Sequence, residues 1–204
     1  CEKVGIRSIA HELPASTSEL DLQNLIDSLN NDSTIDGILV QSPLPLQIQD
    51  EHIIERISAD KDVDGFHPIN VAKLALEDPT GFVPCTPLGC QRLLIDAGIQ
   101  TSGANVVVVG RSMIVGKPMA LLLNLAGATV TMCHSGTIDL AEHTRRADIV
   151  VSAVGKMNLL TAQHFDPARK TVVIDVGMNK NAEGKLVGDC DFNSVQDRKS
   201  TRLN

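Results

Sequence analysis

The chain has 204 residues, 43% of them hydrophobic, which is enough apolar material for one large domain or two small ones. Its net charge of −7 argues against nucleic acid as a main partner, because phosphate binding requires basic patches. No apolar run approaches the roughly 20 residues of a membrane-spanning helix, so we expect no membrane partner. The 5 cysteines lack paired spacing, which favours reduced, buried thiols in a cytoplasmic compartment over a zinc site.

The first half of the chain alternates between strand-like and helical patterns. We predict strands over 4–13 and 36–41, and helices over 18–29, 50–57 and 69–76. Asp62–Gly65 has the composition of a turn. The stretch 78–89 is rich in proline and glycine, and we place a domain boundary after residue 88.

The second half repeats strands and helices in alternation. We predict a linking helix over 90–97, strands over 106–110, 128–133, 148–152 and 171–176, helices over 117–126 and 138–146, and a further segment around 158–164. Strands that alternate with helices imply right-handed crossovers and a parallel sheet. The predicted fold class is therefore α/β.

The stretch 105–118 is the most informative part of the chain. Its run of valines predicts a strand buried on both faces, which Gly110 ends, and after Gly116 a helical segment opens at Pro118. The backbone N–H groups at such a helix start suit a pyrophosphate. The spacing differs from G-x-G-x-x-G, so an ordinary strand-to-helix turn is the alternative. Gly155 and Gly177 end later strands, and with Gly110 they predict a crevice lined by glycines.

The end of the following strand favours NADP over NAD. An NAD site holds the ribose 2′-hydroxyl with an acid there, whereas this chain has His134 and Ser135, with Arg111 beside the glycine turn. A 2′-phosphate suits a fixed positive charge, an imidazole and a hydroxyl. The alternative is that Arg111 is a solvated loop arginine and His134 the neighbour of a helix cap.

Several blocks, taken in order, resemble the bifunctional methylenetetrahydrofolate dehydrogenase/methenyltetrahydrofolate cyclohydrolase family. They are residues 37–45, 61–65, 84–89, 109–118, 129–135 and 187–189. The resemblance covers about residues 1–195. It implies a folate-binding catalytic α/β domain over 1–88 and a Rossmann-like, parallel-sheet NADP-binding domain over 89–195, with folate in the cleft between them.

The resemblance also implies the chemistry. The family oxidises 5,10-methylenetetrahydrofolate to the 5,10-methenyl form with NADP, and then hydrolyses that to 10-formyltetrahydrofolate. We therefore expect tetrahydrofolate derivatives as partners, NADP as cofactor, no metal and a homodimer.

Residue roles carry over by match to the family's motifs. Gln41 resembles the active-site glutamine, and Asp64 resembles the aspartate that holds the pterin ring. Val40 and Ser42 flank Gln41 in the folate wall, where Ser42 replaces a frequent leucine. The residues that resemble the cofactor site are Gly110, Arg111, Ser112, Gly116, His134, Ser135 and Met178. From the residues alone, a turn aspartate that caps its own backbone is the preferred interpretation of Asp64.

The chain departs from the family pattern at both ends. The family's catalytic lysine and its nearby tyrosine belong upstream of Cys1, and Lys3 does not match that lysine. A Pro-Gly-Gly-Val-Gly-Pro segment should follow residue 195, whereas 196–204 is polar and unlike the family. We expect a fragment of impaired activity with a non-native tail. The rival interpretations are a non-catalytic NADP- or folate-binding fragment and another NADP-dependent dehydrogenase on the same fold.

Overall fold

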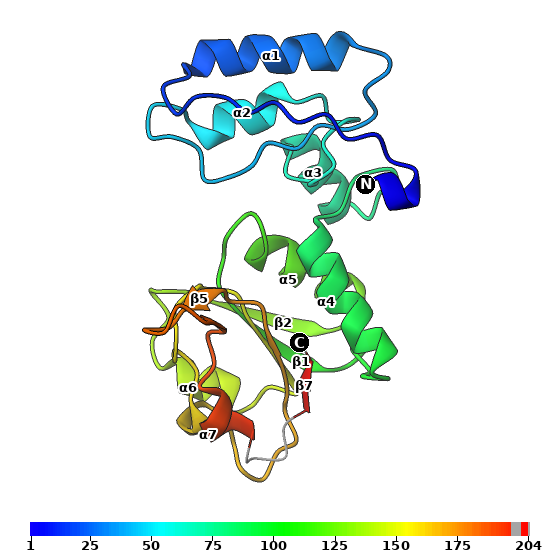
Figure 1. The fold of residues 1–204 in the computed structure, drawn as a ribbon. Helices are drawn as coiled ribbons and strands as arrows, with labels where there is room; N and C mark the ends of the chain where they lie inside the picture. Colours follow the sequence, from blue (N-terminus) through cyan, green and yellow to red (C-terminus); the bar gives the residue numbers. More distant parts are fainter. Residues whose placement is uncertain (197–200, 204) are drawn as a thin grey trace. The chain divides into compact units, whose positions relative to one another are not determined.

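The computed structural model describes residues 1–196 and 201–203 (Figure 1). By its internal contacts the chain divides into two units, Cys1–Val63 and Asp64–Asn204. This division falls earlier in the chain than the boundary expected after residue 88, which stays a prediction.

The first unit is built on two helices, α1 (Glu19–Asn31) and α2 (Asp50–Arg56), preceded by the short 3-10 helix η1 (Glu2–Val4). Helix α1 begins at Ser18, whose hydroxyl accepts a hydrogen bond from the Asp21 N–H at 3.1 Å. The apolar faces of both helices meet in a core formed by Leu22, Ile26, Ile38, Ile48, Ile53 and Ile57. Both predicted helices are confirmed.

The two strands predicted for this unit are wrong. No strand forms over 4–13 in the described structure, and the apolar side chains of this segment, Val4 and Ile6 among them, are exposed. Over 36–41 only Ile38 pairs, in an isolated parallel bridge with Asp62. An alternating apolar pattern makes a strand only where another backbone supplies hydrogen-bond partners, and these segments lack a continuous one.

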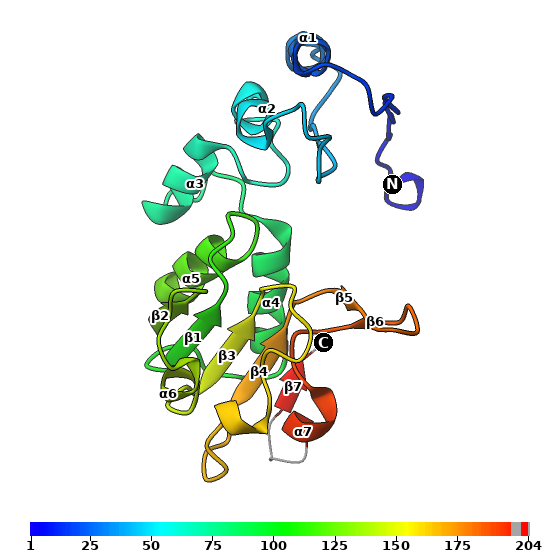
Figure 2. The ribbon, with the colours of Figure 1, turned by 90° about the vertical axis from the view of Figure 1, so that its left-hand side faces the viewer.

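The second unit carries a parallel sheet in the order β2-β1-β3-β4-β7 (Figure 2). Its strands are β1 (Asn105–Val109), β2 (Thr129–Cys133), β3 (Ile149–Ser152), β4 (Val172–Asp175) and β7 (Thr201–Leu203). The predicted α/β class and parallel sheet are confirmed. A two-stranded antiparallel pair, β5 (Asn179–Lys180) and β6 (Leu186–Val187), follows β4.

The helices of this unit precede β1 or lie between its strands. They are α3 (Pro68–Ala75), α4 (Cys85–Asp96), α5 (Gly116–Leu125), α6 (Leu140–Thr144), the 3-10 helix η2 (Ala162–His164) and α7 (Phe192–Gln196). Helix α4 begins at Cys85, earlier than the predicted linking helix over 90–97. The tail expected over 196–204 lies partly outside the described residues, at 197–200 and 204, while Thr201–Leu203 pairs with β4.

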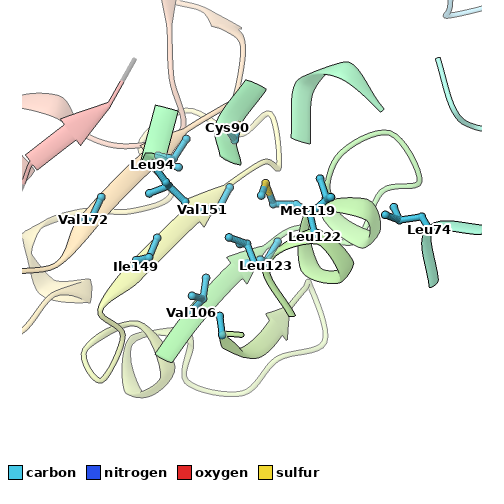
Figure 3. Packing of buried hydrophobic residues seen from close by; sticks show 13 residues of the cluster. Leu74, Cys90, Leu94, Val106, Met119, Leu122, Leu123, Ile149, Val151 and Val172 are labelled. Carbon is cyan, nitrogen blue, oxygen red and sulfur yellow. The ribbon is translucent and has the colours of Figure 1, made fainter. Parts of the chain in front are cut away.

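The valine run of β1 is buried on both faces, as predicted. Val106 and Val108 belong to a core with α4 and α5, which contribute Leu94, Met119 and Leu123 (Figure 3). Val107 and Val109 belong to a second core on the opposite face, with Cys133, Val150, Leu160 and Phe165. This double burial makes the sheet a rigid base for the residues that are predicted to bind the cofactor.

The cysteines are all free thiols. Cys90, Cys133 and Cys190 are buried, as expected, and burial raises the pKa values of Cys90 and Cys133. Cys1 and Cys85 are exposed, so the expectation of burial is wrong for these two. Within the described residues no cluster of metal-binding side chains occurs, and none of their helices is long and apolar enough to cross a membrane.

Candidate functional site

The carboxyl ends of β1 and β2 bring together the residues predicted to bind the cofactor. Val109 is paired with Cys133, and the Gly110 N–H donates a hydrogen bond to the Cys133 carbonyl at 2.9 Å. Arg111 and Ser135 therefore follow two neighbouring strand ends, and both are exposed. Ligands of doubly wound sheets bind at this edge.

The glycine turn depends on both of its glycines. Gly110 has a φ of +122°, a backbone conformation reserved for glycine, and a Cβ there would collide with the carbonyl oxygen of Ala153. A Cβ on Gly116 would lie 2.6 Å from the Gly110 carbonyl carbon and 2.7 Å from Arg111 Cα. The turn thus folds back on its own backbone, which no residue with a Cβ permits.

Ser112, within the turn, is hydrogen-bonded to the backbone at the start of helix α5. Its hydroxyl accepts hydrogen bonds from the N–H groups of Val115 at 3.2 Å and Gly116 at 3.4 Å, and its carbonyl accepts one from Lys117 at 3.0 Å. Pro118 has no N–H to offer. The first turn of α5 is therefore satisfied internally, contrary to the expectation that its N–H groups face the ligand.

The donors available to an anion lie one turn earlier. The backbone N–H groups of Arg111, Ser112, Met113 and Ile114 make no hydrogen bond within the described residues. All four residues are exposed, and in the same part of the structure Arg111 forms no ion pair. Successive free N–H groups beside a guanidinium are a favourable setting for phosphate oxygens.

His134 holds the turn that presents Ser135. Its Nδ1 accepts a hydrogen bond from the Gly136 N–H at 3.0 Å, which assigns the ring proton to Nε2. Its own N–H donates to Thr137 Oγ1 at 2.9 Å, and its carbonyl accepts from the Thr137 N–H at 2.9 Å. The closed turn leaves Ser135 at its exposed tip and only Nε2 of the imidazole for a ligand.

The crevice predicted from three glycines is only partly correct. Gly155 has a φ of +72°, and no atom lies within 4 Å of a Cβ placed on it. At Gly177, by contrast, a Cβ would coincide with the carboxylate of Asp189, so this glycine makes room for an internal side chain. Met178, which follows it and directly precedes β5, is 80% exposed.

Asp189 is a buried organising residue that the sequence analysis did not single out. It is fully buried, and its Oδ2 accepts hydrogen bonds from Ser152 Oγ at 3.0 Å and the Val154 N–H at 2.8 Å. Its Oδ1 accepts from the Lys156 N–H at 2.8 Å. The only sequence signal for it was its place in the Val187–Asp189 block.

The predicted folate residues fall in both units. Val40 is half-buried, and Gln41 and Ser42 are exposed, with Gln41 Nε2 donating to the Ser42 carbonyl at 3.1 Å. This segment belongs to the first unit. Asp64 is half-buried at the start of the second unit, next to Gly65, whose φ of +70° confirms the predicted turn.

Lys61, in the same sequence block as Asp64, has a structural task that the sequence did not reveal. Its Nζ donates to the carbonyls of Leu29 at 2.9 Å, Asn30 at 2.8 Å and Asp32 at 2.8 Å. A cation at the C-terminus of a helix satisfies the last carbonyls and complements the helix dipole. Lys61 therefore closes α1.

Comparison with known proteins matches the two halves of the chain to two domains of one family. Residues 1–64 match the catalytic domain of tetrahydrofolate dehydrogenase/cyclohydrolase, and residues 84–202 match its NAD(P)-binding domain. The chain belongs to the tetrahydrofolate dehydrogenase/cyclohydrolase family. The match to the second domain reaches residue 202, and so overlaps the segment expected to be a non-native tail.

Individual relatives agree with this assignment. The bifunctional protein FolD of Magnetococcus marinus is 52% identical over 194 residues, which are 95% of this chain and 67% of the relative. The crystal structure of the bifunctional FolD dehydrogenase/cyclohydrolase of Campylobacter jejuni has a TM-score of 0.95 and 46% identity, covering 99% of this chain and 71% of that one. The Trypanosoma brucei enzyme, solved with NADP and an inhibitor, has a TM-score of 0.90 and 34% identity, again covering 99% and 71%.

These matches confirm the predicted family, its enzymatic nature and its cofactor. The function of tetrahydrofolate dehydrogenase/cyclohydrolases is NADP-dependent oxidation of methylenetetrahydrofolate and hydrolysis of the methenyl product. The Rossmann-like fold of the second unit agrees with the family's cofactor domain. The rival interpretation as another dehydrogenase on the same fold is not favoured.

Proposed function

We propose that this chain binds NADP and a tetrahydrofolate derivative for the oxidation of 5,10-methylenetetrahydrofolate and the hydrolysis of the methenyl form to 10-formyltetrahydrofolate. The observation that carries the proposal is the exposed pair of Arg111 and Ser135 on neighbouring strand ends, where no acid occurs. A carboxylate at this place would repel a 2′-phosphate, whereas a guanidinium and a hydroxyl bind it.

The cofactor end fits NADP in its donor chemistry. The free N–H groups of 111–114 would receive the pyrophosphate, Arg111 and Ser135 would hold the 2′-phosphate, and His134 Nε2 would be a further donor. Gly110 and Gly116 give the turn its shape, and Ser112 holds the turn to α5. Met178, directly before β5, would contact the bound cofactor. When bound, NADP supplies the acceptor for the hydride that leaves the one-carbon bridge.

The folate residues bind and orient the substrate. Asp64 accepts hydrogen bonds from the amino-pyrimidinone edge of the pterin, a charge-assisted arrangement. Gln41 orients the water that attacks the methenyl carbon, and Val40 and Ser42 form the adjacent wall. That carbon is already electrophilic as an iminium, so positioning of the water and movement of its proton are the main tasks of the protein.

The family resemblance supports a wider proposal about the setting of this enzyme. We place it in the cytoplasm as a homodimer in one-carbon metabolism, where its product serves purine biosynthesis. Small molecules are its partners, in keeping with its net charge of −7. Sedimentation of the purified chain at several concentrations measures its oligomeric state directly.

The cofactor preference is the direct test of the proposed function. NADPH and NADH are titrated into the full chain, and binding is followed by the emission of the reduced nicotinamide. We expect NADPH to bind at least about tenfold more tightly, because hydrogen bonds to charged groups contribute about 1.5–3 kcal/mol each. Equal affinities would remove the support that Arg111 and Ser135 give to the proposal.

A further inference from the structure

The loop after β3 turns its backbone inward while its side chains stay exposed. Val154, Gly155 and Lys156 are exposed residues, yet their N–H groups donate to the carboxylate of Asp189 at 2.8, 3.3 and 2.8 Å. Asp189 is itself fully buried. One buried side chain therefore fixes the path of three successive residues at the carboxyl end of the sheet.

Both oxygens of this carboxylate also receive side-chain donors. Ser152 Oγ donates to Oδ2 at 3.0 Å, and Asn179 Nδ2 donates to Oδ1 at 3.1 Å. A carboxylate only accepts hydrogen bonds, and every partner here is a donor. The site therefore requires an aspartate, because an amide would bring a donor against donors.

A second carboxylate holds Asp189 in place. Asp175, the last residue of β4, accepts hydrogen bonds from the N–H groups of Asp189 at 2.8 Å and Cys190 at 3.0 Å. A Cβ on Gly188 would collide with the Asp175 carboxylate, just as one on Gly177 would collide with that of Asp189. The two aspartates and two glycines form one packed aspartate–glycine cluster, which connects the segment after β6 to the sheet.

This aspartate–glycine cluster lies next to the proposed cofactor site, on the side away from β2. The carbonyl of Ala153, at the start of the loop, lies against Gly110, where a Cβ would strike it. Strand β1 lies between β2 and β3 in the sheet. A dinucleotide with its 2′-phosphate at β2 and its pyrophosphate at β1 extends its other half over β3, where the loop 154–156 lies.

We propose that Asp189 is a positioning residue for the nicotinamide half of the bound cofactor. It holds the loop 154–156 in the shape that supports this half, and it has no part in binding the adenosine half. The inference rests on the proposed function, because it requires that NADP be the ligand.

The test separates the two halves of the cofactor. Asp189→Asn keeps the size of the side chain but places an NH₂ against protein donors, whichever way the amide is turned. The full chain and the variant are titrated with NADPH and with 2′,5′-ADP, which carries the adenosine 2′-phosphate but no nicotinamide. We expect NADPH binding to weaken at least about tenfold, equivalent to about 1.4 kcal/mol, and 2′,5′-ADP binding to change less than about twofold.

Asp148→Asn is the matched control. Asp148 also receives a backbone N–H, that of Asn105 at 2.9 Å, but at the amino end of β1. We expect this variant to leave the ratio of the two affinities unchanged. A fall in that ratio equal to the one in Asp189→Asn would overturn the inference.

Other outcomes separate the inference from the proposed function. If Asp189→Asn weakens the binding of both ligands equally, or weakens neither, the positioning role is overturned while the proposed function stands. Failure of the unaltered chain to bind either ligand overturns the proposed function itself.

Two measurements keep the inference testable if Asp189→Asn does not fold. Ser152→Ala removes a single donor. It should weaken the binding of NADPH by about threefold and leave the binding of 2′,5′-ADP unchanged. In the unaltered chain, the amides of 154–156 should exchange slowly with solvent hydrogen although their side chains are exposed. Fast exchange at these amides, or an equal effect of Ser152→Ala on both ligands, counts against Asp189 as the positioning residue.

Discussion

The carbonyl oxygen of Ala153 lies so close to Gly110 that a Cβ on this glycine would collide with it. The glycine also has a φ of +122°, which residues with side chains do not adopt without strain. The contact joins the turn after β1 to the loop after β3, so a change at Gly110 acts on both segments.

Gly110→Ala should therefore lower the free energy of unfolding by about 3 kcal/mol, from backbone strain and the displaced loop together. Urea unfolding followed by circular dichroism measures it. Gly155→Ala is the control, because its φ of +72° is also positive but no atom lies within 4 Å of the added Cβ. Gly155→Ala should lower the free energy of unfolding by only about 1–2 kcal/mol. Equal losses in the two variants would show that the Ala153 contact contributes nothing.

Arg111→Ala should weaken the binding of NADPH by about tenfold or more and that of NADH hardly at all. Its guanidinium is exposed beside the free N–H groups of the turn, where a 2′-phosphate would receive charge-assisted hydrogen bonds. Lys117→Ala, which removes an exposed cation from the first turn of α5, is the control for general electrostatic attraction. If Arg111→Ala weakened both cofactors alike, the arginine would be bound to the pyrophosphate instead.

Asp64→Asn should weaken the binding of tetrahydrofolate and leave the binding of NADPH unchanged. The amide presents a donor to the donors of the pterin edge, a mismatch of about 2 kcal/mol, or roughly thirtyfold in affinity. Calorimetric titration with each ligand measures both effects, with the exposed neighbour Asp60→Asn as control. Unaltered folate affinity would instead support a turn-capping role for Asp64.

Lys61→Met should destabilise the first unit by about 2 kcal/mol, because it removes a charged donor from the end of α1. Methionine keeps much of the apolar stem, so packing is largely preserved. Hydrogen exchange of the α1 amides measures the loss of stability locally. Lys170 is an exposed lysine of the second unit, and Lys170→Met should leave the exchange of the α1 amides unchanged. Protection of α1 that is equal in both variants would contradict the capping role.

The pair of His52 and Glu19 gives the first unit a pH dependence. Their side chains meet at 2.8 Å, and the hydrogen bond to Glu19 raises the pKa of His52. A backbone hydrogen bond from Gln49, followed by the one to His52, lowers the pKa of Glu19. The contribution of His52 is full below its unfolded pKa of about 6.5 and is lost as pH rises through its folded pKa.

The contribution of Glu19 is present above its unfolded pKa of about 4.3 and is lost as pH falls through its lowered folded pKa. The pair should therefore stabilise most between about pH 4.3 and 6.5. Titration of the His52 ring by NMR should give a midpoint above about 6.5, and Glu19→Gln should bring it down. An unchanged midpoint in Glu19→Gln would show that the pair does not form in solution.

Local patterns were sufficient to predict β1, β2, β3 and β4 of the sheet, whereas β7 falls in the segment that was expected to be a non-native tail. The valine run, the breakers at Gly110 and Gly116, and the missing acid after β2 are all short-range signals, and the structure places their residues at one edge of the sheet. The strand predicted over 36–41 was wrong because a strand depends on a neighbouring backbone as hydrogen-bond partner, and in this segment only Ile38 has one.

Asp189 and Lys61 could not be assigned from the sequence for a different reason. The partners of Asp189 are mostly backbone N–H groups of 154–156, and those of Lys61 are backbone carbonyls at the end of α1. Backbone groups are the same at every residue apart from proline, so they leave no trace in the sequence. Such contacts become visible only when the chain path is known.

The valine run of β1 has a consequence for how the sheet finds its alignment. A shift by one residue would exchange Val106 and Val108 for Val107 and Val109, so each face would still receive valines. Burial therefore discriminates poorly between alignments, and the strand ends must decide.

At one end the Asn105 N–H donates to Asp148, and at the other the Gly110 N–H donates to the Cys133 carbonyl, each at 2.9 Å. The correct alignment of the sheet thus depends on the same glycine turn that we propose binds the cofactor. A substitution in this turn would therefore disturb both the alignment of the sheet and the proposed cofactor site.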